Sequence, residues 1–284
     1  MRTHLWVTTA TAAVAIAVAV PPVVSSSPPG TSPGTAVAFG TAAPADRCDQ
    51  PGPYELPHAD DTVHLDPADF TTEIDNPYWP MRVGTTWVYG ETEPDGTRKR
   101  VEIVVTDRTR TIDGIEARVV HDVVTEGGEI IENTFDWYAQ DVGGNLWYLG
   151  EFTREYENGV PVNTEGSWEH GVDGAQAGVA IPAQPRAGCS YRQEYYEGVA
   201  EDKGRILTTR DDVKVRGERY RDVLTTSDRV PLDPFVLEHK FYAPGVGPVL
   251  SAGVSPDGAR EELIWVSGLP AIRGPRSYHL GGAP

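Results

Sequence analysis

The chain has 284 residues, and its 42 Asp and Glu outnumber its 24 Lys and Arg to give a formal net charge of -18. An acidic surface repels nucleic acids and anionic lipids, so we exclude both as partners. Once an N-terminal leader is set aside, the length suits a single domain.

The N-terminal region predicts export. Arg2 is followed by an uncharged run, rich in Ala and Val, over residues 5–24. A single cation before an apolar run is the pattern of a secretory signal peptide. Pro21 and Pro22 would end a membrane-anchoring helix early, which favours cleavage over retention. We therefore predict a signal peptide over residues 1–26 and a secreted, extracellular protein with no stable membrane insertion after cleavage.

The next segment, residues 27–45, consists mostly of Pro, Gly, Ser, Thr and Ala without a charge. Such a segment buries too little apolar surface to offset its conformational entropy, so we predict a disordered tether. A single β-rich domain over residues 46–284 follows. Its two cysteines, Cys48 and Cys189, are expected to form a disulfide because export places them in an oxidising compartment.

Strand signals dominate the domain. Short runs that alternate apolar and polar residues are separated by turns, among them the hairpin signal Asp113-Gly114. A crossing rich in Gly, Ala and Pro, residues 171–188, separates two halves, and no window has a helical period. The pattern predicts an all-β, single-domain antiparallel meander that forms a barrel, half-barrel or sandwich. The predicted strands cover residues 86–89, 98–107, 115–125, 130–140, 146–156, 160–169, 191–197, 205–214, 220–229, 236–242, 249–254 and 261–266.

Five segments carry a resemblance. They are IDNPYWP at 74–80, GTTWVYG at 84–90, DWYAQD at 136–141, YRQEYY at 191–196 and EHKFYAPGVG at 238–247. In these segments the chain resembles an uncharacterised group of exported bacterial β-rich proteins. The resemblance implies one coherent domain over most of residues 70–250. It brings no established activity and therefore no catalytic residue.

Carboxylates are the first candidates for chemistry. The chain contains no nucleophile elbow, zinc-protease motif or phosphate loop. Paired acids on neighbouring strands can perform general acid and base work on a glycosidic bond, so we consider Asp136 and Glu194 as catalytic acids. His239, which shares a strand face with apolar residues, is the candidate base. The alternative is structural, with charged turns, salt bridges and a core histidine.

No cofactor is evident, but the many carboxylates make calcium a candidate ligand. No spacing identifies which residues would bind a metal, so the metal ligands stay unknown.

Aromatic residues are the second group of candidates. Aromatic rings beside acids can stack on sugars or line a small-molecule cavity, and they can equally fill a barrel interior. The candidate ligand-binding residues are Trp137, Tyr138, Trp147, Tyr196 and Asp75.

Together these patterns predict a secreted or cell-wall-associated binding protein for a small molecule or glycan, held in a β-barrel cavity or groove. Two alternatives stay open: a carboxylate-dependent glycan hydrolase or lyase, and a structural surface protein without a small ligand. An enzyme should gather the candidate acids and His239 in one cleft, whereas a binder should have a cavity.

Overall fold

The computed structural model describes residues 48–254 and 258–268. The predicted signal peptide and tether lie outside these residues. The all-β prediction is confirmed, because the described residues form sixteen strands in one antiparallel sheet and a single 3-10 turn, η1 (Pro67–Asp69). No helix among them is long and apolar enough to cross a membrane.

The strands follow the predicted meander closely. In chain order they are β1 (Phe70–Thr71), β2 (Thr86–Thr92), β3 (Arg98–Ile112), β4 (Ile115–Glu126), β5 (Glu129–Asp141), β6 (Leu146–Glu157), β7 (Val160–Asn163), β8 (Trp168–Glu169), β9 (Gln176–Ile181), β10 (Ser190–Arg192), β11 (Glu194–Tyr195), β12 (Lys203–Val215), β13 (Glu218–Val230), β14 (Asp233–Ala243), β15 (Gly247–Gly253) and β16 (Arg260–Ser267). The predicted crossing at residues 171–188 is wrong in one respect, because it contains β9.

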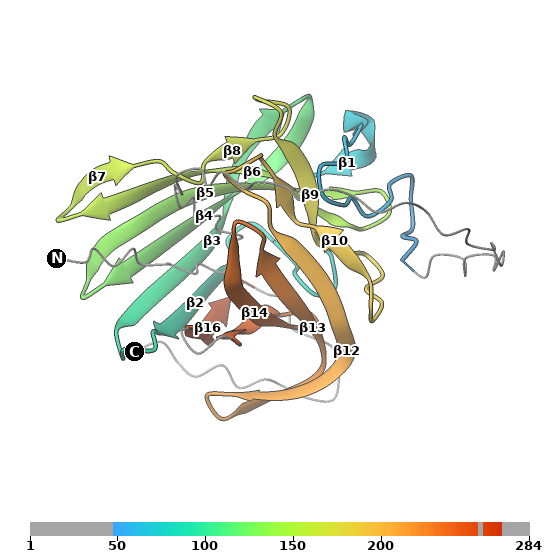
Figure 1. Cartoon of the computed structure of the whole chain (residues 1–284). Coiled ribbons are helices and arrows are strands. Elements are labelled where there is room, and N and C mark those ends of the chain that lie inside the picture. Colours follow the sequence, from blue (N-terminus) through green and yellow to red (C-terminus); the bar gives the residue numbers. More distant parts are fainter. Residues whose placement is uncertain (1–47, 255–257, 269–284) are drawn as a thin grey trace, which may run out of the picture.

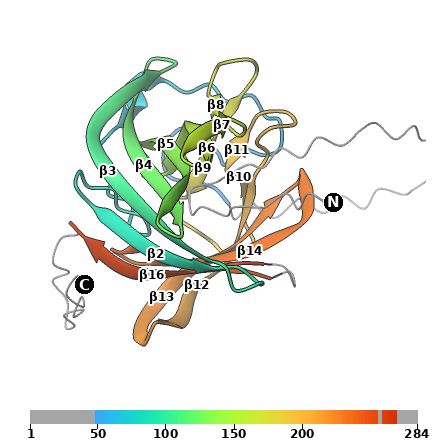
Figure 2. The ribbon, with the colours of Figure 1, turned by 90° about the vertical axis from the view of Figure 1, so that its left-hand side faces the viewer.

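The sheet curls into a nearly closed barrel, which decides among the three predicted architectures. Its strand order is β10-β12-β13-β14-β15-β16-β2-β3-β4-β5-β6-β9-β11. Because β16 pairs with β2, the first and last long strands are neighbours and join the two halves of the meander. Figure 1 shows β3 to β6 on one side and β12 and β13 on the other, and Figure 2 shows the curvature of the two halves.

The barrel closes where the chain steps from one edge of the sheet to the other. β10 pairs with β12 at one edge, β11 pairs with β9 at the other, and Gln193 alone separates them. At this seam Gly178 packs against the backbone of Gln193, and a Cβ on it would lie 2.3 Å from the Gln193 carbonyl group. Only glycine therefore fits here.

Arg192 holds the seam together. It is 1 % exposed, and its guanidinium donates to the carbonyl oxygens of Ala59 (2.9 Å), Asp61 (2.7 Å) and Ala177 (2.6 Å). Burial lowers the pKa of Arg192 to about 10. One side chain thus links β10, β9 and the N-terminal segment.

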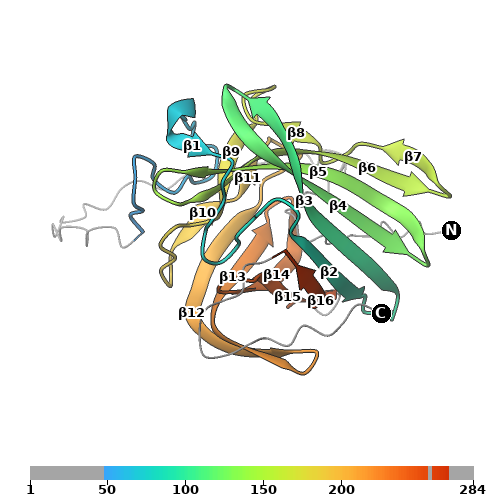
Figure 3. The ribbon, with the colours of Figure 1, turned by 180° about the vertical axis from the view of Figure 1, so that it is seen from behind.

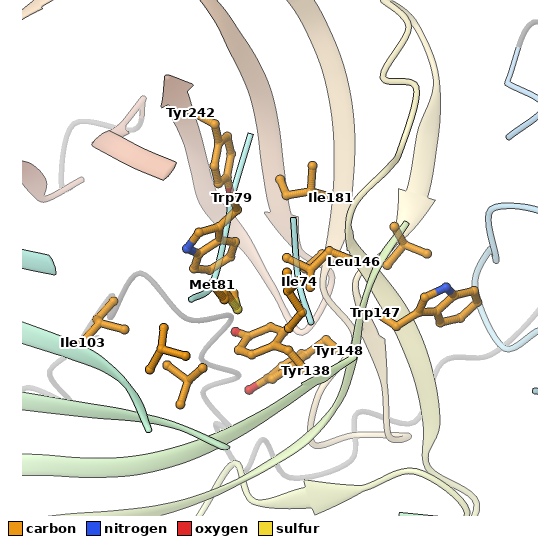
Figure 4. Packing of buried hydrophobic residues seen from close by; sticks show 14 of the residues in the cluster. Ile74, Trp79, Met81, Ile103, Tyr138, Leu146, Trp147, Tyr148, Ile181 and Tyr242 are labelled. Atoms are coloured by element: carbon orange, nitrogen blue, oxygen red, sulfur yellow. The ribbon is translucent and has the colours of Figure 1, made fainter. Parts of the chain in front are cut away.

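Residues 74–81 close one end of the barrel, which we call the plug end. The segment turns at Asn76, whose Oδ1 accepts from the Tyr78 backbone N–H at 3.0 Å. Trp79, 4 % exposed, packs against Tyr138 and Tyr242 with ring centroids 5.6 and 5.9 Å away. Figure 4 shows these rings together. β7 lies at the opposite end, which we call the β7 end (Figures 1 and 3).

The predicted disulfide is confirmed. Cys48 and Cys189 are bonded, with their Cα atoms 5.4 Å apart and a sequence separation of 141. The bond links Cys48, the first described residue, to Cys189, which directly precedes β10 beside the seam.

A candidate binding site at the end of an acidic barrel

A pocket of about 360 Å³ lies at the β7 end, where the hairpins β4–β5 and β6–β7 and the β2–β3 turn meet. Its lining residues are Thr97, Lys99, Glu126, Ile131, Glu132, Glu155, Tyr156, Glu157 and Val162. Small-molecule sites typically measure about 300–1,000 Å³ and combine apolar walls with a few polar groups. The volume of this pocket falls within that range, but six of its nine lining residues are polar or charged and three are apolar or aromatic.

The pocket is strongly acidic. Four of its lining residues are glutamates and one is a lysine. The Lys99 ammonium already has partners, since its Nζ lies 3.0 Å from Glu91 Oε1 and also contacts Glu93. Asn163 Nδ2 donates to Glu155 Oε2 at 2.7 Å and holds that carboxylate in place. The field in the pocket therefore favours a cation.

The acidity continues into the barrel interior along the strand register. One row of buried polar residues crosses six strands, each residue directly opposite the next. In order it comprises Lys99, Glu91, Glu261, Ser251, Lys240 and Thr226. Lys240 Nζ lies 3.3 Å from Asp228 Oδ2 and 4.0 Å from Glu238 Oε2. Both buried lysines of this row are thus already neutralised.

A second acidic group occupies the inner face of β4, β5, β6 and β11. Asp136 on β5 lies opposite Glu151 on β6, and both are at most 1 % exposed. Tyr148 Oη lies 2.7 Å from Asp136 Oδ1 and 2.9 Å from Glu151 Oε2. Glu194 accepts from Trp168 Nε1 at 2.8 Å.

These carboxyl groups cannot all be ionised. Desolvation by burial raises the pKa of Asp136 to about 7 and the pKa values of Glu91 and Asp202 to about 8. Burial, followed by repulsion from neighbouring carboxylates, raises the pKa values of Asp122 and Glu151 well above their ordinary range. A buried carboxylate without a cation prefers to keep its proton.

The structure brings together two of the three predicted catalytic residues. Asp136 and Glu194 are both buried in the interior; desolvation and then repulsion from Asp202 raise the pKa of Glu194, and repulsion from Asp136 adds a smaller contribution. His239 is half-buried and lies on the other face of β14 from the inward-facing Glu238 and Lys240. The small cavity bounded by Tyr148 and Lys240 has a volume of about 10 Å³, room for roughly one water.

The five predicted ligand-binding residues lie in different places. Trp137 is on the outer face, with the Arg110 guanidinium 4.3 Å from its ring centroid. Tyr138 faces inward and stacks on Tyr148 at 4.8 Å. Trp147 is covered by the N-terminal segment and points away from the interior cluster in Figure 4.

The remaining two make local contacts. Tyr196 forms the turn after β11 through its backbone bridge to Ala200. Asp75 is exposed and accepts from Gln140 Nε2 at 2.6 Å, which fixes the plug segment to β5.

Sequence reasoning missed the pocket and most of the interior acids. The missed acids are Glu91, Asp122, Glu132, Asp228, Glu238 and Glu261. The available signal was a charged residue at alternate positions of a strand whose intervening positions are largely apolar, as with Glu238 and Lys240 in the stretch from Leu237 to Phe241. Among the described residues no group of three or more His, Cys, Asp or Glu is arranged to hold a metal ion, so calcium stays a sequence-based prediction.

No protein-family model matches the chain, and no curated protein matches it. Two solved structures are similar. One is a proposed exported protein with a YmcC-like fold from Bacteroides fragilis, 12% identical, with a TM-score of 0.38, and the match covers 68% of this chain and 100% of that one. The other is a proposed lipoprotein from Parabacteroides distasonis, 13% identical, with a TM-score of 0.35, covering 68% of this chain and 99% of that one. Both similarities are too distant to carry a role to this chain.

Proposed function

We propose that this chain is an exported binding protein for a small organic cation, a molecule that carries one or more ammonium groups on an aliphatic or aromatic body. The observation that supports the proposal is the pocket of about 360 Å³ at the β7 end, with four glutamates and a single, already paired lysine in its lining. Export follows from the predicted signal peptide.

The chemistry of the lining favours an organic cation over a bare metal ion. Ile131, Tyr156 and Val162 provide apolar surface for methylene groups, and the Tyr156 ring can accept a cation on its face. Glu126 and Glu157 are exposed at the rim, where they attract an ammonium group and fix its position. A single ion would leave most of the volume unfilled.

A titration of the purified secreted chain tests the proposal. Isothermal calorimetry with 1,4-diaminobutane and with tryptamine should give saturable binding, whereas 1,4-butanediol, which lacks the charge, should not bind. The double variant Glu126→Gln/Glu157→Gln should weaken amine binding about three- to tenfold, since removal of rim charges costs up to about 1 kcal/mol per pair.

The matched control is the double variant Glu73→Gln/Glu218→Gln, which makes the same charge change at two exposed glutamates outside the pocket, one before the plug segment and one at the start of β13. It should bind the amines as the unmodified chain does. A neutral disaccharide in the same assay distinguishes the glycan alternative. Saturable sugar binding without amine binding would overturn the proposal.

A further inference from the structure

The pocket and the interior acids share one residue. Glu132 lines the pocket yet is only 3 % exposed, and it belongs to the inner face of β5 together with Thr134 and Asp136. Thr134 Oγ1 donates to Glu132 Oε1 at 3.3 Å and lies 2.6 Å from Thr153 Oγ1 on β6. Polar contact is therefore continuous from the pocket wall into the barrel.

Asp122, on the strand next to Thr134, has carboxyl oxygens without hydrogen-bond partners in the described part of the chain. Thr134 pairs in register with Asp122 on β4. Asp122 is 1 % exposed, and neither of its carboxyl oxygens has a hydrogen-bond partner among the described residues. An ionised carboxylate in that position would be costly, and a nearby positive charge would relieve the cost.

The hydrogen-bond geometry requires a stored proton deeper inside. Tyr148 Oη is within hydrogen-bond distance of Asp136 and Glu151, but a phenol has only one proton to donate. If the phenol donates to one carboxylate, the other carboxyl must be protonated and donate to Tyr148 Oη. The second oxygen of each carboxyl group, Asp136 Oδ2 and Glu151 Oε1, has no partner within the described part of the chain. The pair is therefore built around at least one exchangeable proton.

We propose that cation binding in the pocket is coupled to proton release from these interior carboxyl groups, with Glu132 as the residue common to both. A bound ammonium group beside Glu132 would reduce the electrostatic repulsion that Glu132 exerts on Asp122, Asp136 and Glu151. The interior acids then ionise more readily, and by reciprocity their ionisation strengthens cation binding. This coupling rests on the proposed function, because it regulates the same pocket.

Repulsion by Glu132 contributes to the raised pKa values of Asp122, Asp136 and Glu151, after the larger effect of desolvation. Other charged and titratable groups also face this cluster. They are Glu91 from β2, Tyr138 from β5, Tyr148 from β6, Glu194 from β11, Asp202 before β12, Lys240 from β14 and Glu261 from β16. Lys240 is the one cation among these named groups, and repulsion between the carboxyl groups opposes their ionisation.

Calorimetry with 1,4-diaminobutane at pH 7 in two buffers of different ionisation enthalpy, phosphate and HEPES, neither of which is a net cation, tests the coupling. The difference in binding heat counts the protons released, and we expect about one or more for each amine bound. The affinity should rise from pH 6 to pH 8 by up to about tenfold per pH unit for each proton, a range in which the diamine itself stays fully charged.

Glu132→Gln should remove most of the proton release and, because Glu132 lines the pocket, should also weaken amine binding. Asp136→Asn, which preserves shape, should lower proton release without altering the pocket lining. Equal heats in the two buffers, with clear binding, would overturn the coupling and leave the proposed function intact. Absence of amine binding in both buffers would overturn the coupling together with the proposed function.

Discussion

The two ends of this barrel are built by the same strands but have opposite chemistry. On the inner face of β5, Tyr138 lies toward the plug end, Asp136 and Thr134 follow, and Glu132 reaches the pocket at the β7 end. At the plug end the rings of Trp79 and Tyr138 pack closely, whereas the β7 end contains about 360 Å³ of space lined by carboxylates. The comparison indicates that packing at the plug end stabilises the fold, whereas the β7 end has the open space in which the proposed cation would bind.

The largest effect should come from the disulfide, which secures the N-terminal segment that supplies the plug. In Cys48→Ala/Cys189→Ala the loop of 141 positions is no longer closed in the unfolded chain. The chain-entropy model predicts a loss of about 4–5 kcal/mol in the free energy of unfolding. Urea denaturation of this variant, and of the unmodified chain with and without reductant, measures it. A loss below about 1 kcal/mol would contradict the structural role of the bond.

The plug itself gives the second test of the comparison. Trp79→Ala removes a buried ring from contact with Tyr138 and Tyr242 and should cost about 3–5 kcal/mol. Amine affinity at the β7 end should change less than twofold, since the two ends are separate. Phe235→Ala, at a side chain that is 83% exposed, is the control and should leave stability within about 0.5 kcal/mol. A large loss of affinity in Trp79→Ala would mean that the ends are not independent.

The positions of most strands could be predicted because they depend on local signals. The Asp113-Gly114 hairpin is an example, where both residues adopt the positive φ angles, 45° and 84°, that such a turn requires. β9 was missed because its sequence fits a contact with residues that are distant in the chain, and this contact leaves no local strand signal. Gly178 weakens the local strand pattern, and its reason is the close approach of Gln193 at the seam.

The candidate site was harder to predict, because alternation separates the two faces of a strand without telling which one is inside. On β14 the sequence places His239 and Phe241 on one face and Glu238 and Lys240 on the other. The more apolar face would ordinarily be buried, yet the acidic and basic side chains face the interior here. Closure of the barrel decides the orientation, and closure depends on the pairing of β16 with β2, more than 160 residues apart in the chain. The same long-range pairing aligns acidic residues from different strands into rows, and the sequence of one strand does not show this alignment.

The smallest expected change, counted per pH unit, tests whether the acidic interior stores protons. Carboxyl groups whose pKa is raised on folding bind more protons in the folded chain than in the unfolded chain, so the free energy of unfolding should fall as the pH rises. For Asp136, with a pKa of about 7, the fall begins near pH 4, where the unfolded residue ionises, and ends above pH 7. Asp136→Asn should therefore reduce the slope by up to about 1.4 kcal/mol per pH unit in this range.

Urea denaturation from pH 4 to pH 9 measures this slope, and Asp107→Asn, at an exposed position on β3, is the matched control with an unchanged slope. The groups under test are the carboxyl groups buried between the two ends of the barrel. If stability rose with pH through neutrality, these groups would have to be ionised in the folded chain. A cation already resident among them would then be required, and the interior would be a binding site in its own right, continuous with the pocket at the β7 end.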